Sequence, residues 1–140
     1  MHLRFYLTFL MSFVALSGGA QPLPAVADSA AAAAESLRYS SVAEALQSIR
    51  SKPGVSVNLT QPDGWTIVTD PSPVLSVWSF TPMNHPAYPS VVRRKIQQDS
   101  NGNVSVIMLA MCEAPKEPCD QLIQDFQLIN ERMIKGARQR

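Results

Sequence analysis

Apolar and polar residues recur with a helical period between residues 42 and 49. Val42, Ala45, Leu46 and Ile49 fall on one helix face. Ser41-Val-Ala-Glu44 matches a capping box, in which Ser and Glu each satisfy a free backbone N–H at a helix start. Pro53-Gly54 then stops the pattern. These features predict a short helix that begins after Ser41.

The period changes to two beyond this helix. Runs rich in apolar residues, alternating with polar ones at 55–59, predict strands near 55–59, 65–69, 74–81, 91–98 and 104–111. Pro62-Asp-Gly64 and Asp99-Ser-Asn-Gly-Asn103 have the composition of tight turns between them. Short turns between successive strands predict an antiparallel meander of about five strands. Because 104–111 is apolar at nearly every position, it is expected to be a central strand covered on both faces.

The last segment, from about Pro118 to Lys135, has the clearest helical pattern in the chain. Its apolar stripe comprises Cys119, Leu122, Ile123, Phe126, Ile129, Met133 and Ile134. Gly136 is placed to end the helix. The sequence therefore predicts an α+β fold, with an N-terminal helix and a long C-terminal helix packed on the sheet. Both helices are expected to cover the same sheet face.

The N-terminal residues have the composition of an export signal. Arg4 precedes an apolar run of about twelve residues, and small residues that suit cleavage end at Ala20 and again at Ala27. The run is shorter than the roughly 20 apolar residues of a membrane-spanning helix, so no stable membrane insertion is expected after cleavage. We predict a signal peptide at 1–27, a flexible Ala-rich linker at 28–40 and one domain at 41–137. The expected location is the periplasm or the extracellular medium.

Removal of residues 1–27 leaves a chain without net charge. Of twelve Lys and Arg, only Arg4 lies in the signal, whereas all eleven acidic residues lie beyond it. A neutral chain lacks the positive field that supplies most nonspecific affinity for nucleic acid or anionic lipid. No phosphate-binding loop or metalloprotease motif is found either, so no cofactor is expected.

The chain has two cysteines, Cys112 and Cys119, at either end of a short Pro-containing segment. In an oxidising compartment each is the other's internal partner, which predicts a disulfide between the last strand and the last helix. A redox centre is the alternative, but such centres usually place two residues between the cysteines and here there are six. A zinc site is disfavoured because His85 is the one further nitrogen ligand in the predicted domain.

The loop from Thr81 to Ser90 is the most unusual polar stretch. Three prolines stiffen it, and it presents His85 and Tyr88, which can bind by stacking and hydrogen bonding. Strand alternation sends Arg93 and Lys95 to one face and Arg94 to the other. We take His85, Tyr88, Arg93 and Lys95 as candidate partner-binding residues. The alternative is a rigid crossover loop beside an ordinary solvated face.

A catalytic interpretation of His85 requires a carboxylate and a hydroxyl within hydrogen-bond reach in one concave pocket. Asp70 with Ser79 or Ser90 can be nominated, but no motif supports such a trio, and no catalytic or metal-ligating residue is assigned. The favoured function is an exported non-catalytic binding domain whose partner is a protein or a small anionic ligand. A small hydrolase centred on His85 and a secreted virulence or stress factor acting on another protein are the alternatives.

Two stretches carry a family resemblance. Val77-Trp-Ser-Phe-Thr-Pro82, continuing through His85-Pro-Ala-Tyr-Pro-Ser-Val-Val-Arg-Arg94, is the first, and Met111-Cys-Glu-Ala-Pro-Lys116 with Cys119-Asp120 is the second. They resemble a family of small, mostly uncharacterised exported proteins of Gram-negative bacteria. The resemblance implies a periplasmic or secreted α+β domain with a bridged cysteine pair. It implies no catalytic residues.

Overall fold

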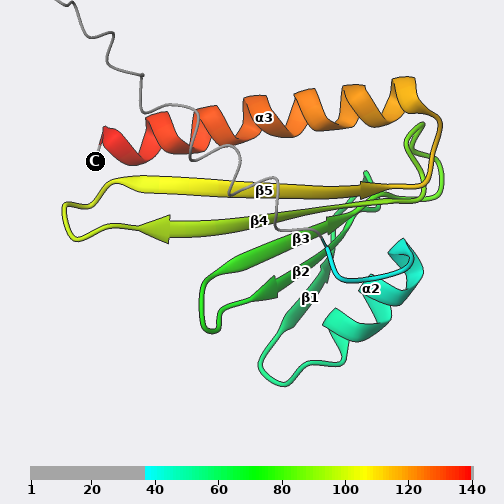
Figure 1. The fold of residues 1–140 in the computed structure, drawn as a ribbon, viewed down its shortest axis with the longest axis horizontal. Coiled ribbons are helices and arrows are strands. Elements are labelled where there is room, and N and C mark those ends of the chain that lie inside the picture. The colour runs from blue at the N-terminus through cyan, green and yellow to red at the C-terminus, as the bar shows by residue number, and fades with distance from the viewer. Residues whose placement is uncertain (1–36, 140) are drawn as a thin grey trace, which may run out of the picture.

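The computed structural model describes residues 37–139, so the expected signal peptide and most of the expected linker lie outside the described residues. The elements are α2 (Val42–Arg50), β1 (Ser56–Leu59), β2 (Thr66–Asp70), β3 (Ser76–Phe80), β4 (Ser90–Gln98), β5 (Val104–Cys112) and α3 (Lys116–Arg138). The five strands form one sheet in the order β1-β2-β3-β4-β5, and each neighbouring pair is antiparallel (Figure 1). The predicted α+β meander with an N-terminal and a C-terminal helix is confirmed.

The predicted central position of the last strand is wrong. β5 pairs with β4 alone and forms an edge of the sheet. Its apolar pattern has another cause. Met111 packs against the core on the α2 side, whereas Met108 packs against the core on the α3 side. The strand therefore has apolar residues on both faces of the sheet, although only one of its two edges is hydrogen-bonded to another strand in the described part of the chain.

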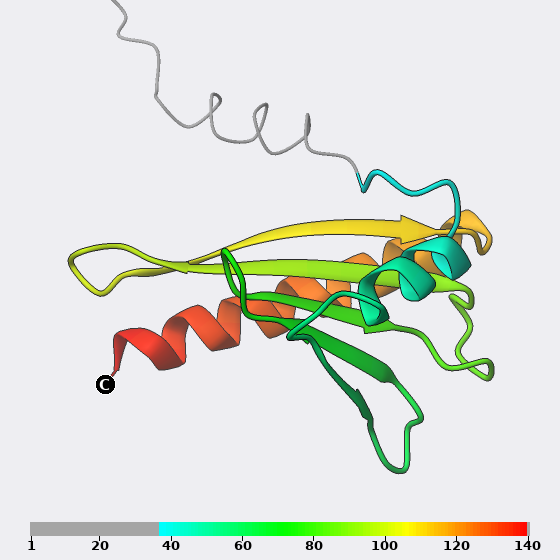
Figure 2. The same ribbon diagram turned by 90° about the horizontal axis from the view of Figure 1, so that it is seen from below.

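The two helices cover opposite faces of the sheet, which corrects the expectation that both cover one face (Figures 1 and 2). The α2 side buries Val42, Ala45 and Ile49 with Val68, Trp78, Phe80 and Val91. The α3 side buries Leu122 and Phe126 with Ala87 and Val92. Val91 and Val92 are successive residues of β4, and successive strand side chains point to opposite faces. One strand thus supplies both cores.

The start of α2 is held by contacts from near and far in the sequence. Ser41 is the N-cap, and its hydroxyl accepts a hydrogen bond from the Glu44 amide at 3.1 Å. A carboxylate oxygen of Glu113 accepts one from the Val42 amide at 2.6 Å. Leu37 and Tyr39 lie within the stretch expected to be linker, yet both pack against the α2-side core. The packed domain therefore includes residues 37–40.

Helix α3 is longer than its pattern predicts. It continues through Gly136 to Arg138, so the prediction that Gly136 ends the helix is wrong. Of the predicted stripe, Cys119, Leu122 and Phe126 are buried, whereas Ile129 is 41% exposed. Asn130 is buried instead, and its amide nitrogen donates to the Met108 sulfur at 3.4 Å. The sheet therefore covers mainly the first half of the apolar stripe.

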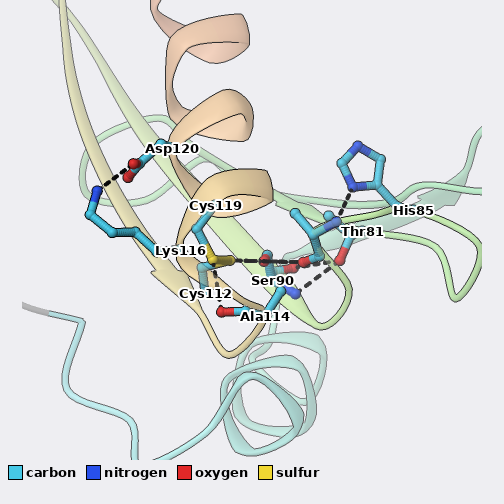
Figure 3. Close-up of a disulfide and its surroundings, with 9 residues drawn as sticks. Thr81, His85, Ser90, Cys112, Ala114, Lys116, Cys119 and Asp120 are labelled. Carbon is cyan, nitrogen blue, oxygen red and sulfur yellow. Dashed lines mark hydrogen bonds and ion pairs between the residues drawn. A yellow bond between two sulfur atoms is a disulfide. The ribbon is translucent and has the colours of Figure 1, made fainter.

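The predicted disulfide between Cys112 and Cys119 is confirmed. The two sulfurs are 2.00 Å apart, and the bridge joins the end of β5 to the first turn of α3 (Figure 3). The Ser90 hydroxyl donates to the Ala87 carbonyl and lies 2.7 Å from the Cys112 sulfur. The bridge thus fixes where α3 begins and places it beside the 81–90 loop. Among residues 37–139, neither helix is both long enough and apolar enough to span a membrane.

Candidate functional site between α3 and the sheet

The loop between β3 and β4 is closed at its base by backbone and side-chain hydrogen bonds. The Thr81 amide donates to the Ser90 carbonyl at 3.0 Å, and the Ser90 amide donates to the Thr81 hydroxyl at 2.9 Å. Both residues are buried. Because its two ends are joined in this way, the loop has a fixed position relative to both sheet faces.

Further hydrogen bonds shape the loop interior. The His85 amide donates to the Pro82 carbonyl at 3.0 Å, and the Tyr88 amide donates to the His85 carbonyl at 2.9 Å. The Ala87 amide donates to Nδ1 of His85 at 3.0 Å (Figure 3). These bonds hold the imidazole against its own loop and fix the orientation of the ring.

The structure does not bring the four predicted binding residues together. His85 lines a cavity on the α3 side. Tyr88 lines a groove beside Leu46 of α2, and Arg93 lies on the α2 side with its guanidinium 5.0 Å from the centroid of the Trp78 ring. Lys95 follows two residues later on the same strand face as Arg93 and is half-buried. The predicted site is therefore divided between the two faces of the sheet.

The α3 cavity, with a volume of about 300 Å³, lies between α3 and the sheet. Its lining residues are Trp65, Ile67, Ser79, His85, Arg94, Leu122, Asp125, Phe126 and Ile129. A second hollow of about 470 Å³ shares His85, Leu122 and Asp125 with it and reaches Glu117 at the start of α3. The α3 cavity has mostly apolar walls with a few polar groups, which is typical of small-molecule sites.

Aromatic contacts hold the walls of the α3 cavity in place. The ring of Trp65 meets that of His85 at a centroid distance of 5.1 Å and that of Phe126 at 5.8 Å. Both contacts are edge-to-face, an arrangement that stabilises aromatic pairs beyond simple area burial. Trp65 therefore connects the loop, the sheet and α3 into one preformed wall.

Arg94 provides the cationic group of the α3 cavity. Its guanidinium carbon lies 5.3 Å from the centroid of the Phe126 ring, and its Nε is buried without a hydrogen-bond partner among the described residues. Burial lowers the pKa of Arg94 from its ordinary value, although an arginine remains charged in a protein. Strand alternation predicts from the sequence that Arg94 and Arg93 lie on opposite faces of the sheet. No sequence pattern predicts that α3 covers Arg94.

The geometry of His85 favours a hydrogen-bond donor over a general base. An amide N–H that points at Nδ1 requires this nitrogen to be unprotonated, so the neutral ring carries its proton on Nε2. A triad-type base needs the opposite arrangement, with an orienting carboxylate at Nδ1. Ser79 and Asp125 line the same cavity, but neither shares a hydrogen bond with His85 in the described part of the chain. The nominated Asp70 lies on the other face, paired with Lys52.

The Tyr88 groove is a second concave surface, with a volume of about 480 Å³, on the α2 side of the loop. Its residues are Leu46, Leu59, Gly64, Thr66, Phe80, Thr81, Pro82, Met83, Asn84 and Tyr88. Met83 is 85% exposed, Leu59 56% and Tyr88 45%, so its rim presents apolar side chains to solvent. Within residues 37–139, no group of three His, Cys, Asp or Glu side chains is placed to hold a metal ion.

The fold and these two surfaces define a small α+β domain whose C-terminal helix is tied to the sheet by a disulfide. Comparisons with protein-family models, with curated proteins and with solved structures give no significant match.

Proposed function

We propose that this chain is an exported, non-catalytic binding domain that takes a small molecule in the α3 cavity. Export is supported by the signal-like N-terminus and by the formed disulfide, which is a bond typical of oxidising compartments. The observation that carries the binding proposal is the cavity itself. Apolar walls from Trp65, Leu122 and Phe126 surround the polar groups of His85 and Arg94.

A non-catalytic role follows from the chemistry of these polar groups. Nε2 of His85 and the guanidinium of Arg94 are both hydrogen-bond donors. Donors of this kind orient a ligand, but neither is an activated nucleophile or a base with an orienting carboxylate.

The proposal is tested by NMR titration of the ¹⁵N-labelled domain with three probes of similar size. These are 3-phenylpropanoate, 3-phenylpropanol and 3-phenylpropylamine, which are anionic, neutral and cationic at neutral pH. Saturable shifts at Trp65 and Phe126 are expected with at least one probe, without shifts at Trp78, which lies on the other face. If no probe gives saturable shifts at Trp65 or Phe126, the proposal is overturned.

The Tyr88 groove supports a second candidate function, the binding of a partner protein. Its exposed rim of Leu59, Met83 and Tyr88 is the kind of apolar surface that protein interfaces cover. A photo-crosslinking side chain at position 83 is expected to capture one envelope protein, and Tyr88→Ser is expected to reduce the yield without lowering the Tm. Unchanged capture in Tyr88→Ser would count against this candidate.

A further inference from the structure

We infer that the ligand of the α3 cavity is a small apolar monocarboxylate whose carboxylate binds Arg94. This inference rests on the proposed binding function and specifies its ligand class. Its starting point is the environment of one guanidinium, which lies against Phe126 within an apolar cavity.

One nitrogen of the Arg94 guanidinium, Nε, lacks among the described residues the hydrogen bond that a buried polar group normally has. Charged groups removed from water are costly unless they are paired and hydrogen-bonded. In the described part of the chain, Nε of Arg94 is buried without a hydrogen-bond partner, and the guanidinium carbon lies 5.3 Å from the centroid of the Phe126 ring. An anion entering the cavity would supply the missing acceptor atoms. The buried Nε of Arg94 then gains an acceptor in the bound state.

The form of the guanidinium selects a carboxylate among anions. Its planar fork of N–H groups matches two carboxylate oxygens in a bidentate pair. Asp125 lines the same cavity and accepts a hydrogen bond from Gln121 at 2.9 Å, so a second negative charge lies nearby. A ligand with one negative charge meets less repulsion from Asp125 than a phosphate dianion or a dicarboxylate does. The cavity therefore favours a monoanion.

The positions of the acidic residues also orient the ligand. Glu117 lies along the hollow that continues past His85, whereas Asp125 lines both this hollow and the α3 cavity. A carboxylate is repelled from that end and directed toward Arg94. Nε2 of His85 carries a proton and offers a neutral donor between the two ends.

The walls determine the rest of the ligand. Trp65, Ile67, Phe126 and Ile129 present rings and branched alkyl groups to the cavity, and Ile129 is 41% exposed. An aromatic or alkyl body would remove this surface from water, which is favourable by roughly 25 cal/mol for each Å² buried. A volume of about 300 Å³ limits the ligand to a small molecule.

The test measures dissociation constants by ¹⁵N NMR for 3-phenylpropanoate, 3-phenylpropanol and inorganic phosphate. Wild type is compared with Arg94→Met, Arg94→Lys and the matched control Arg93→Met, which alters the neighbouring arginine on the opposite face. 3-Phenylpropanoate is expected to bind at least about tenfold more tightly than the alcohol, because a charge-assisted pair is added. Phosphate is expected to give no saturable shifts at Arg94.

The variants assign the effect to one residue. Arg94→Met is expected to reduce 3-phenylpropanoate binding to the level of the alcohol, and Arg93→Met to leave it unchanged. Arg94→Lys keeps the positive charge but lacks the planar guanidinium, so an intermediate affinity for 3-phenylpropanoate is expected. With two variants at position 94, the conclusion does not depend on the folding of either one alone. Dispersed spectra in each case confirm the fold.

Three results would overturn the inference. Equal binding of acid and alcohol to wild type would leave the binding function standing and exclude the carboxylate. Phosphate that competes with 3-phenylpropanoate would exclude selection for a monocarboxylate. Absence of binding by every probe, including the cationic amine, would remove the proposed function as well.

Discussion

The guanidinium carbon of Arg94 lies 5.3 Å from the centroid of the Phe126 ring, so a residue of α3 covers a cationic side chain of β4. On the opposite face, Arg93 lies 5.0 Å from the ring of Trp78. Two successive arginines thus contact aromatic rings on the two sides of one strand. They differ in their electrostatic surroundings, because Arg93 helps to lower the pKa of the Asp70 carboxyl, whereas burial lowers the pKa of Arg94 itself.

This difference predicts unequal effects of the two substitutions on the free energy of unfolding. Arg94→Met keeps an unbranched side chain over Phe126 and removes a desolvated charge, so the free energy of unfolding is expected to stay within about 1 kcal/mol of wild type or to rise. Arg93→Met removes an attraction to Asp70 and is expected to lower it by about 1 kcal/mol. Urea denaturation of both variants measures the two values. A loss of more than about 2 kcal/mol in Arg94→Met would mean that this arginine is structural.

The disulfide is expected to contribute about 2.5 kcal/mol to stability, the chain-entropy estimate for a closed loop of eight residues. Replacing both Cys112 and Cys119 by Ser should lower the free energy of unfolding by about this amount. Urea denaturation with and without reductant measures it. Wild type should become less stable on reduction, and the double variant should not respond. Equal stability of the oxidised wild type and the double variant would contradict the prediction.

Asp70 is expected to make folding sensitive to acid. Burial alone would raise the pKa of this carboxyl, but hydrogen bonds from Lys52 and from the Ser72 amide outweigh burial and lower it. Its stabilising contribution is therefore complete well above the unfolded-state pKa of about 3.9 and is lost as the pH falls through the lower folded-state pKa. Asp70→Asn should lower stability at pH 7 by about 1–3 kcal/mol.

The measurement for Asp70 is a series of urea denaturation curves between about pH 7 and pH 2. The stability difference between wild type and Asp70→Asn should shrink as the pH falls through the folded-state pKa. Asp63→Asn changes an exposed aspartate in the β1–β2 turn and serves as the matched control. A difference that stays constant over the whole range would show that Lys52 and Asp70 contribute no pH-dependent stability.

Glu113 is expected to stabilise α2 although 71 residues separate it from Val42. Its carboxylate accepts the hydrogen bond of an amide in the first turn of that helix, where a free N–H and the helix dipole both favour an anion. Glu113→Ala should lower the free energy of unfolding by about 1 kcal/mol, and Glu113→Gln should lower it less because an acceptor oxygen remains. Glu117→Ala, at an exposed position in the first turn of α3, is the control. A larger effect of Glu117→Ala in urea denaturation would refute this assignment.

Local sequence patterns were sufficient for the elements and their order. The Ser41 cap, the turn at Pro62-Asp-Gly64 and the alternation in each strand depend on neighbouring residues, and the structure has α2, the hairpins and the meander where these signals lie. The cysteine pair was also predictable, because two thiols in one predicted domain had no other internal partner. Such features are fixed by backbone geometry over a few residues.

The candidate site was only partly predictable. The stiff, polar loop makes His85 a candidate from the sequence, and His85 lines the α3 cavity. The sequence does not mark Arg94, Trp65 or Phe126 as site residues, because each looks like an ordinary strand or core residue on its own. They lie close together because α3 packs on one particular face of the sheet. No local sequence pattern specifies which face that is.

By itself the sequence determined which segments become helices and strands, how successive strands pair, and which sulfurs are joined, because these depend on short-range periodicity, turns and redox chemistry. The tertiary structure alone decided that α2 and α3 lie on opposite faces and that β5 lies at an edge. It also decided that Arg94 is enclosed with aromatic rings while Arg93 faces the other way. These features depend on which apolar helix faces are buried against which sheet faces, and that is a property of the whole folded chain.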